Sequence, residues 1–142
     1  MDSEVLVVGK FEGGAKLIRA LERLVAVSAA LWLYDSELNR WQLLIVLGNF
    51  DPKTDPRVYY REIGDALSKL PEPRAVEISD VYVVGPDEPV IQALRESSLG
   101  QAANVEGVRL GGNQVGNVFI PAAYLYRLFG PSKIKLRRSG RR

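Results

Sequence analysis

Apolar and polar positions along the chain follow two different periods, which predicts both helices and strands. Within residues 16–25 the apolar side chains recur every three or four positions and charged side chains occupy the opposite face, as in an amphipathic helix. A second helix is expected to begin after Asp55, a good N-cap residue followed by proline, and to end before Pro71. A third, shorter helix is expected over residues 88–97.

Runs of β-branched and other apolar residues, bounded by glycine, proline or polar turns, predict the strands. Two of these runs, residues 28–35 and 40–47, flank a polar turn of four residues and are expected to form a hairpin. A second hairpin is expected around the glycine- and asparagine-rich turn at residues 111–114. The remaining expected strands are residues 4–9, 76–85 and 123–128.

In chain order these elements are β-α-β-β-α-β, followed by a helix and a hairpin. The fold class that we predict is therefore α+β, with a ferredoxin-like β-α-β-β-α-β core and a C-terminal helix and β-hairpin extension. The length of 142 residues suits one domain, which we expect over residues 1–131. Residues 132–142 are expected to form a separate, basic C-terminal tail.

The first expected hairpin carries a candidate binding patch of aromatic residues. If Asp35 pairs with Arg40, then Trp32, Tyr34 and Trp41 lie on one face of the hairpin. Such a face could stack bases, as in RNA-recognition domains, contact a partner protein, or form one wall of a small-molecule pocket. The second strand lacks the motif of the RNA-recognition domains. A Tyr–Trp pair packed inside the protein is the commoner outcome.

Composition removes several kinds of chemistry. The chain has no cysteine and no histidine, which excludes disulfides, thiolate nucleophiles, histidine-dependent triads and typical zinc sites. A carboxylate site for a hard cation such as Mg²⁺ remains open. The candidate carboxylates lie in pairs beside expected turns, where such side chains usually cap the backbone, so we expect no catalytic residue, metal or cofactor. These pairs are Asp35 and Glu37, Asp51 and Asp55, and Asp87 and Glu88.

Residues 9–16 are rich in glycine and lie between an expected strand and an expected helix, where backbone amides can hold phosphate. They resemble a P-loop only in the separation of Gly9 and Gly14. Ala15 stands where a P-loop has lysine, and Lys16 stands where it has serine or threonine. We therefore interpret this segment as a flexible turn between strand and helix.

The distribution of charge is the most unusual feature of the sequence. The net charge is +2, yet residues 132–142 hold six basic side chains and no acidic one. The other residues hold 13 basic and 17 acidic side chains, a net charge of −4. Such an arm attracts a phosphate backbone without reading its sequence, although a merely solubilising terminus has the same composition. The candidate nucleic-acid contacts are Lys133, Lys135, Arg137, Arg138, Arg141 and Arg142.

The first residues are polar and acidic, and no apolar run approaches the roughly 20 residues that a membrane span needs. We therefore expect a soluble, cytoplasmic protein with no membrane partner. Our functional hypothesis is a non-enzymatic binding or assembly module whose basic tail contacts nucleic acid or an acidic protein surface. Its apolar strands favour a subunit of a larger complex or a homo-oligomer. The alternatives are a carboxylate- and Mg²⁺-dependent enzyme acting on a phosphate-containing substrate, and a small-molecule sensor that uses the aromatic face.

Overall fold

The structure is a computed structural model that describes residues 8–97 and 104–129. Over these residues the chain forms three α-helices, one short 3₁₀ helix and five strands. In chain order they are α1 (Val8–Leu21), β1 (Val27–Asp35), β2 (Arg40–Leu47), α2 (Pro56–Ser68), η1 (Ile78–Asp80), β3 (Val81–Val83), α3 (Pro89–Glu96), β4 (Asn104–Val115) and β5 (Val118–Phe129).

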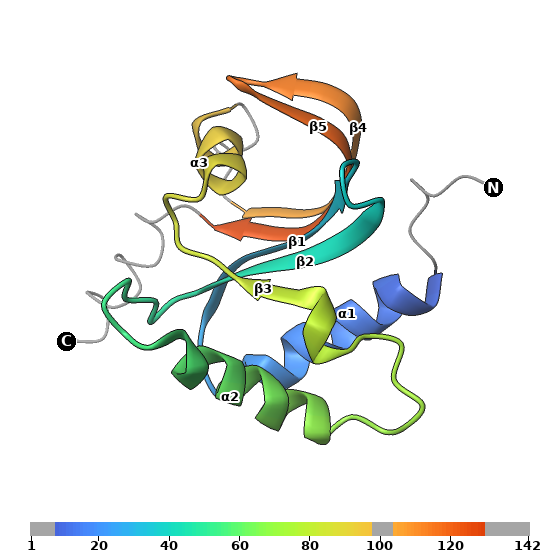
Figure 1. Ribbon diagram of the computed structural model, residues 1–142, viewed down its shortest axis with the longest axis vertical. Helices are drawn as coiled ribbons and strands as arrows, with labels where there is room; N and C mark the ends of the chain where they lie inside the picture. Colours follow the sequence, from blue (N-terminus) through green and yellow to red (C-terminus); the bar gives the residue numbers. More distant parts are fainter. Residues whose placement is uncertain (1–7, 98–103, 130–142) are drawn as a thin grey trace.

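The five strands form one mixed sheet in the order β3-β2-β1-β5-β4. The pairs β1–β2, β1–β5 and β4–β5 are antiparallel, and β3 runs parallel to β2. Helices α1 and α2 lie together on one side of the sheet, whereas α3 lies on the other side next to the β4–β5 hairpin (Figure 1). The protein is therefore an α+β fold, as the sequence predicts, with helices on both faces of its sheet.

The ferredoxin-like strand order predicted from the sequence is wrong. Of the expected first strand, residues 4–7 lie outside the described residues, and Val8 and Gly9 begin α1. A split βαβ core would place that first strand beside β2. In the structure β3 lies there, parallel to β2, because the chain crosses over through α2. The expected strand at residues 76–85 is reduced to Val81–Val83, because η1 occupies the residues before it.

The C-terminal hairpin is part of the sheet and not an extension of it. Residues 118–129 form a single strand, β5, which pairs with β1 from Ala29↔Leu128 to Leu33↔Ala123. Pro121 does not interrupt β5, because it lies beyond the stretch that pairs with β1 and therefore needs no donor on that side. The sheet thus depends on pairing between segments about 95 residues apart, which the local sequence pattern does not encode.

The hairpin of β1 and β2 has the predicted register. Asp35 pairs with Arg40, Tyr34 with Trp41, and Trp32 with Leu43. Asp35 Oδ1 accepts hydrogen bonds from the backbone N–H groups of the turn, which fixes the start of β2. Both faces of this hairpin are apolar and, as expected, both are covered over most of their length.

Two hydrophobic cores lie on the two faces of the sheet. The first, between the sheet and the pair α1 and α2, includes Leu17, Trp32 and Ile63, which are all 0 % exposed. The second, on the side of α3, includes Leu31, Ile91 and Leu125, which are also 0 % exposed. Complete burial of one such side chain contributes roughly 1.5–3 kcal/mol. Among the described helices, none has the length and apolar content needed to cross a membrane.

Candidate functional site

The predicted aromatic patch begins with Trp32, which lies on β1 beneath α1. Its side chain is 0 % exposed, and its Nε1 donates a hydrogen bond to Tyr126 Oη at 2.9 Å. Tyr126 Oη in turn donates to the carbonyl oxygen of Phe11 on α1. Burial raises the pKa of Tyr126 well above its ordinary value, so the hydroxyl keeps the proton that it donates. In this structure Trp32 therefore packs α1 onto the sheet, and its ring faces are covered.

The other two patch residues, Tyr34 and Trp41, lie on the same face as Trp32, as the register predicts. Their rings meet edge to face, with centroids 5.5 Å apart and planes at 62°. Tyr34 is 3 % exposed and its hydroxyl bonds to Asn39 Oδ1, whereas Trp41 is half-buried. The structure therefore brings the three aromatic residues together, with only Trp41 among them reaching the surface.

The glycine-rich residues 9–16 are helical and form the first half of α1, so the expected turn between strand and helix is not formed there. Lys10 lies on this helix and pairs with Asp80 at 2.8 Å, with its Nζ 6.0 Å from the centroid of the Trp32 ring. The backbone N–H groups of an uninterrupted helix point along its axis and cannot form the concave cradle of a P-loop. The glycines of this segment instead allow close packing, because Gly14 has no side chain and α1 can therefore approach Trp32 and Tyr126.

Four of the six candidate carboxylates, those of Asp35, Asp51, Asp55 and Glu88, accept hydrogen bonds from backbone N–H groups of turns and helix starts. Asp51 Oδ1 accepts from the Lys53 backbone N–H at 2.9 Å, and Glu88 Oε1 accepts from that of Val90 at 2.8 Å at the start of α3. Asp55 caps α2, and hydrogen bonds from the side chain and then the backbone of Arg57 lower the pKa of its carboxyl. Within residues 8–97 and 104–129 no three acidic side chains come close enough to hold a metal ion.

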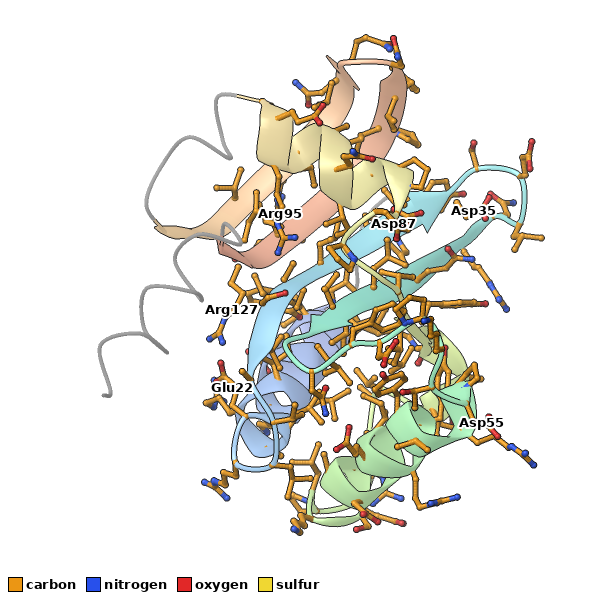
Figure 2. All side chains as sticks on the ribbon, turned by 90° about the vertical axis from the view of Figure 1, so that its left-hand side faces the viewer. Glu22, Asp35, Asp55, Asp87, Arg95 and Arg127 are labelled. Atoms are coloured by element: carbon orange, nitrogen blue, oxygen red, sulfur yellow. The ribbon has the colours of Figure 1, made fainter. Side chains whose placement is uncertain are left out.

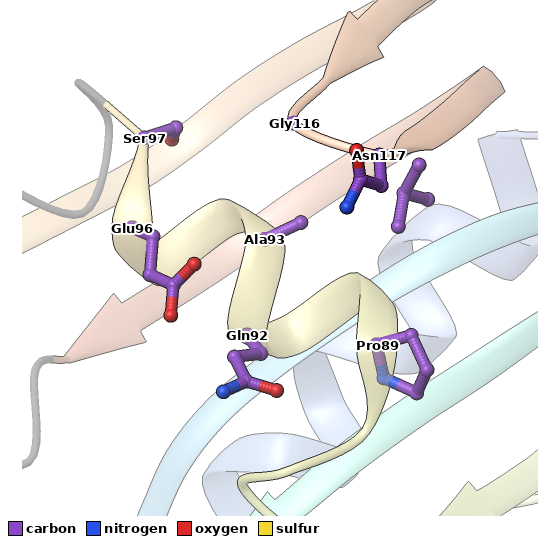
Figure 3. Close-up of a pocket in the computed structure, with 8 residues that line it drawn as sticks. Pro89, Gln92, Ala93, Glu96, Ser97, Gly116 and Asn117 are labelled. Carbon is purple, nitrogen blue, oxygen red and sulfur yellow. The ribbon is translucent and has the colours of Figure 1, made fainter.

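A groove lies between α3 and the turn that joins β4 to β5 (Figure 3). Its volume is about 400 Å³, and Asn117 of the turn lies across it from Ala93 of the helix. Of the lining residues that the structure describes, Glu96 alone is charged. The groove is open and is lined by both polar and apolar side chains, and none of the described residues that line it has a positive charge that would hold an anion.

A second hollow lies at the C-terminal end of α2 and has a volume of about 490 Å³. Leu67, Val76 and the exposed Ile78 supply its apolar lining, and Gly64 leaves space on the helix side. Arg74 lies at its rim but is already engaged, because it donates to the carbonyl oxygens of Leu67 in the last turn of α2 and of Leu70 after it, and pairs with a glutamate. The hollow therefore has an apolar lining, and the arginine at its rim is already bound within the protein.

Arg95 is a candidate binding residue that sequence reasoning missed. It lies in the last turn of α3, half-buried between the helix and the sheet (Figure 2). Its Nη2 donates to Ser28 Oγ of β1 at 3.3 Å. Because 67 residues separate the two, no local motif could have indicated this contact.

The six predicted nucleic-acid contacts at residues 133–142 lie outside the described residues. The structure does describe the end of the strand that precedes this segment in the chain. Leu128 pairs with Ala29 of β1, and β5 ends one residue later, at Phe129. The basic segment therefore follows directly from the end of the sheet at which Ser28 and Arg95 lie.

Comparison with protein-family models, curated proteins and solved structures finds no match to this chain.

Proposed function

We propose that the protein is a cytoplasmic, non-enzymatic binding module that contacts nucleic acid through the basic segment at residues 132–142. The observation that carries this proposal is the separation of charge. Six basic and no acidic side chains lie in those eleven residues, whereas the rest of the chain carries a net charge of −4. An acidic body repels a polyanion weakly, so attraction must come from the basic segment.

The physical basis of the binding is the release of counterions from the phosphate backbone. Each phosphate neutralised by a lysine or arginine changes the slope of log affinity against log salt concentration by about −0.9 on duplex DNA. If all six basic side chains make contacts, the slope is about −5, and affinity falls roughly 10³-fold between 50 and 200 mM salt. Such contacts position the protein without specifying a sequence.

Geometry at the other predicted sites supports a binding module over the two alternatives. The Mg²⁺-dependent enzyme would use carboxylates that are free to bind a metal. Backbone N–H groups instead donate hydrogen bonds to Asp35, Asp51, Asp55 and Glu88. The small-molecule sensor would need space beside the aromatic face, where Trp32 is fully enclosed.

The test measures binding of a labelled 20-nucleotide DNA, as single strand and as duplex, and of the matching RNA by fluorescence anisotropy across a salt series. A tail-neutralised protein keeps the full chain and replaces all six basic side chains with glutamine; its substitutions are K133Q, K135Q, R137Q, R138Q, R141Q and R142Q. We expect this protein to lose most of its affinity and most of the salt dependence.

The control is a body-neutralised protein with the same net charge of −4, made by replacing six exposed basic residues elsewhere. Its substitutions are K16Q, R19Q, K53Q, R61Q, K69Q and R109Q. It should bind almost as the natural chain does. Equal binding by the two neutralised proteins would overturn the proposal. Tail-dependent binding to polyglutamate without binding to DNA or RNA would instead assign the segment to an acidic protein partner.

A further inference from the structure

Arg95 has one hydrogen bond and no counter-ion among the residues that the structure describes. Its Nη2 donates to Ser28 Oγ at 3.3 Å, and Ser28 donates to the carbonyl oxygen of Val46 at 3.2 Å. Ser28 is only 3 % exposed, so its hydroxyl is a fixed part of the sheet. This chain of contacts holds the guanidinium in one place at the edge of the second core.

Among the described residues, the remainder of the guanidinium has no hydrogen-bond partner. Its Nε is enclosed and has no acceptor, and the described part of the chain places no carboxylate in an ion pair with it. Removal of water lowers the pKa of Arg95 from its ordinary value, as expected for a cation without an opposite charge. A cation that has lost its contact with water destabilises the fold unless an anion pairs with it. The planar guanidinium of arginine can donate two parallel hydrogen bonds to the oxygens of a phosphate or a carboxylate, so these are the anions that suit it best.

The position of Arg95 links it to the basic segment. Ser28 precedes Ala29, whose partner on β5 is Leu128, and Lys133 follows five residues further along the chain. Five residues span at most about 18 Å. About five nucleotides of a DNA strand advance by a similar distance along the helix axis. One strand can therefore reach Arg95 and the basic segment together.

A second arginine close to this end of the sheet is already paired. Arg127 of β5 forms an ion pair with Glu22, which follows α1, and Figure 2 shows both on the same side of the molecule as Arg95. The neighbouring cation is thus neutralised by a described residue, whereas no described carboxylate forms an ion pair with Arg95.

We propose that Arg95, held by Ser28, is an anion-binding site that takes one phosphate group of the nucleic acid contacted by residues 132–142. The inference rests on the proposed function and adds a fixed contact on the folded body to those of the basic segment. The phosphate oxygens accept hydrogen bonds from the guanidinium, and the contact sets where the strand crosses the sheet end without reading its bases.

The first experiment compares three full-length variants in the anisotropy salt series. Arg95→Gln should reduce the slope of log affinity against log salt concentration by about 0.9, the share of one phosphate contact. Arg95→Lys retains the charge and should keep most of that slope, which separates a binding role from a purely structural one. Arg61→Gln removes an exposed arginine from α2, on the other face of the sheet, and should leave the slope unchanged.

The second experiment uses the tail-neutralised protein and follows the Nε–Hε NMR signal of Arg95 during titration with inorganic phosphate and, separately, with a trinucleotide. A shift that saturates with either probe and is absent for Arg61 supports the site. A saturating shift with phosphate, in a chain that does not bind DNA or RNA, would leave the anion site standing as one for a small phosphate while the proposed function fails.

The inference is overturned if Arg95→Gln binds nucleic acid with the natural slope, or if the Arg95 signal does not respond to either probe. Backbone amide spectra of each variant establish that it is folded before binding is measured. If Arg95→Gln does not fold, the NMR titration of the tail-neutralised protein, which keeps Arg95, still decides the question.

Discussion

At the scale of single residues, Gly14 decides how closely α1 approaches the sheet. A Cβ atom at this position would lie 2.5 Å from Tyr126 Oη and 2.9 Å from Trp32 Nε1. Neither neighbour can move easily, because Tyr126 is hydrogen-bonded to both Trp32 and the carbonyl oxygen of Phe11. The glycine therefore marks a close contact between helix and sheet and not a break in the helix.

Gly14→Ala should lower the free energy of unfolding by about 1–3 kcal/mol, because the new methyl group overpacks a rigid contact. Urea denaturation measures the change. Gly9→Ala is the matched control in the same helix, since its Cβ would meet only Ala75 at the ordinary distance of 3.6 Å. It should leave stability unchanged or raise it by up to about 1 kcal/mol. A Gly14→Ala protein as stable as the Gly9→Ala protein would contradict this account of α1.

The same contact predicts energetic coupling between Gly14 and Tyr126. Tyr126→Phe alone should cost about 1–3 kcal/mol, because it leaves the buried Trp32 Nε1 without an acceptor. It also removes the oxygen with which the new methyl group collides. The cost of the double variant should therefore be smaller than the sum of the two single costs by at least about 0.5 kcal/mol, as a double-mutant cycle would measure. Strict additivity would show that the two residues do not meet.

At the scale of elements, α3 is a short helix that depends on its first turn. It has eight residues, and Glu88 caps it by accepting hydrogen bonds from the N–H groups of Val90 and Ile91. An isolated helix of this length is unstable in water, so the cap and the buried face at Ile91 and Leu94 must hold it. This helix also carries Arg95, so its order determines whether the proposed anion site exists.

Glu88→Ala should destabilise α3 by about 0.5–2 kcal/mol, which corresponds to roughly 2- to 30-fold faster amide hydrogen exchange at Leu94. Exchange elsewhere in the sheet should change little. Glu96→Ala makes the same chemical change at the exposed C-terminal end of α3, where it should leave exchange unchanged or slow it slightly. If both variants speed exchange equally, the cap does not hold the helix.

The elements differ in how well the sequence predicts them, and the reason is the range of the interactions that form them. The β1–β2 hairpin and the start of α2 are predicted well, because Asp35, Arg40 and Asp55 act on their immediate neighbours. The start of α1 is missed, because Gly14 resembles a turn residue until its contact with Tyr126 is known. The strand order is missed because β5 pairs with β1 across most of the chain.

At the scale of the whole molecule, the protein combines a mixed sheet, covered by helices on both faces, with a basic segment that follows its last strand. The sequence alone identifies the basic segment, because charge needs no fold to be counted. It could not identify Arg95, since an isolated arginine in a short helix has no distinguishing pattern. Only the fold brings Arg95 beside Ser28 and close to the end of β5.

This arrangement predicts that the basic segment and the folded body contribute differently to binding. We expect the basic segment to supply most of the affinity for a polyanion, and the folded body to supply one fixed contact at Arg95. The two parts should respond differently to salt, because the number of phosphates neutralised sets the slope. Substitutions on the exposed faces of α1 and α2 should have little effect on binding.

The most direct test of this account is the slope of log affinity for duplex DNA against log salt concentration in the two neutralised proteins, which carry the same net charge. We predict a slope of about −6 for the body-neutralised protein, which keeps the basic segment and Arg95, and one no steeper than about −1 for the tail-neutralised protein. Equal slopes in the two proteins would contradict the account, because binding would then follow net charge and not residues 132–142.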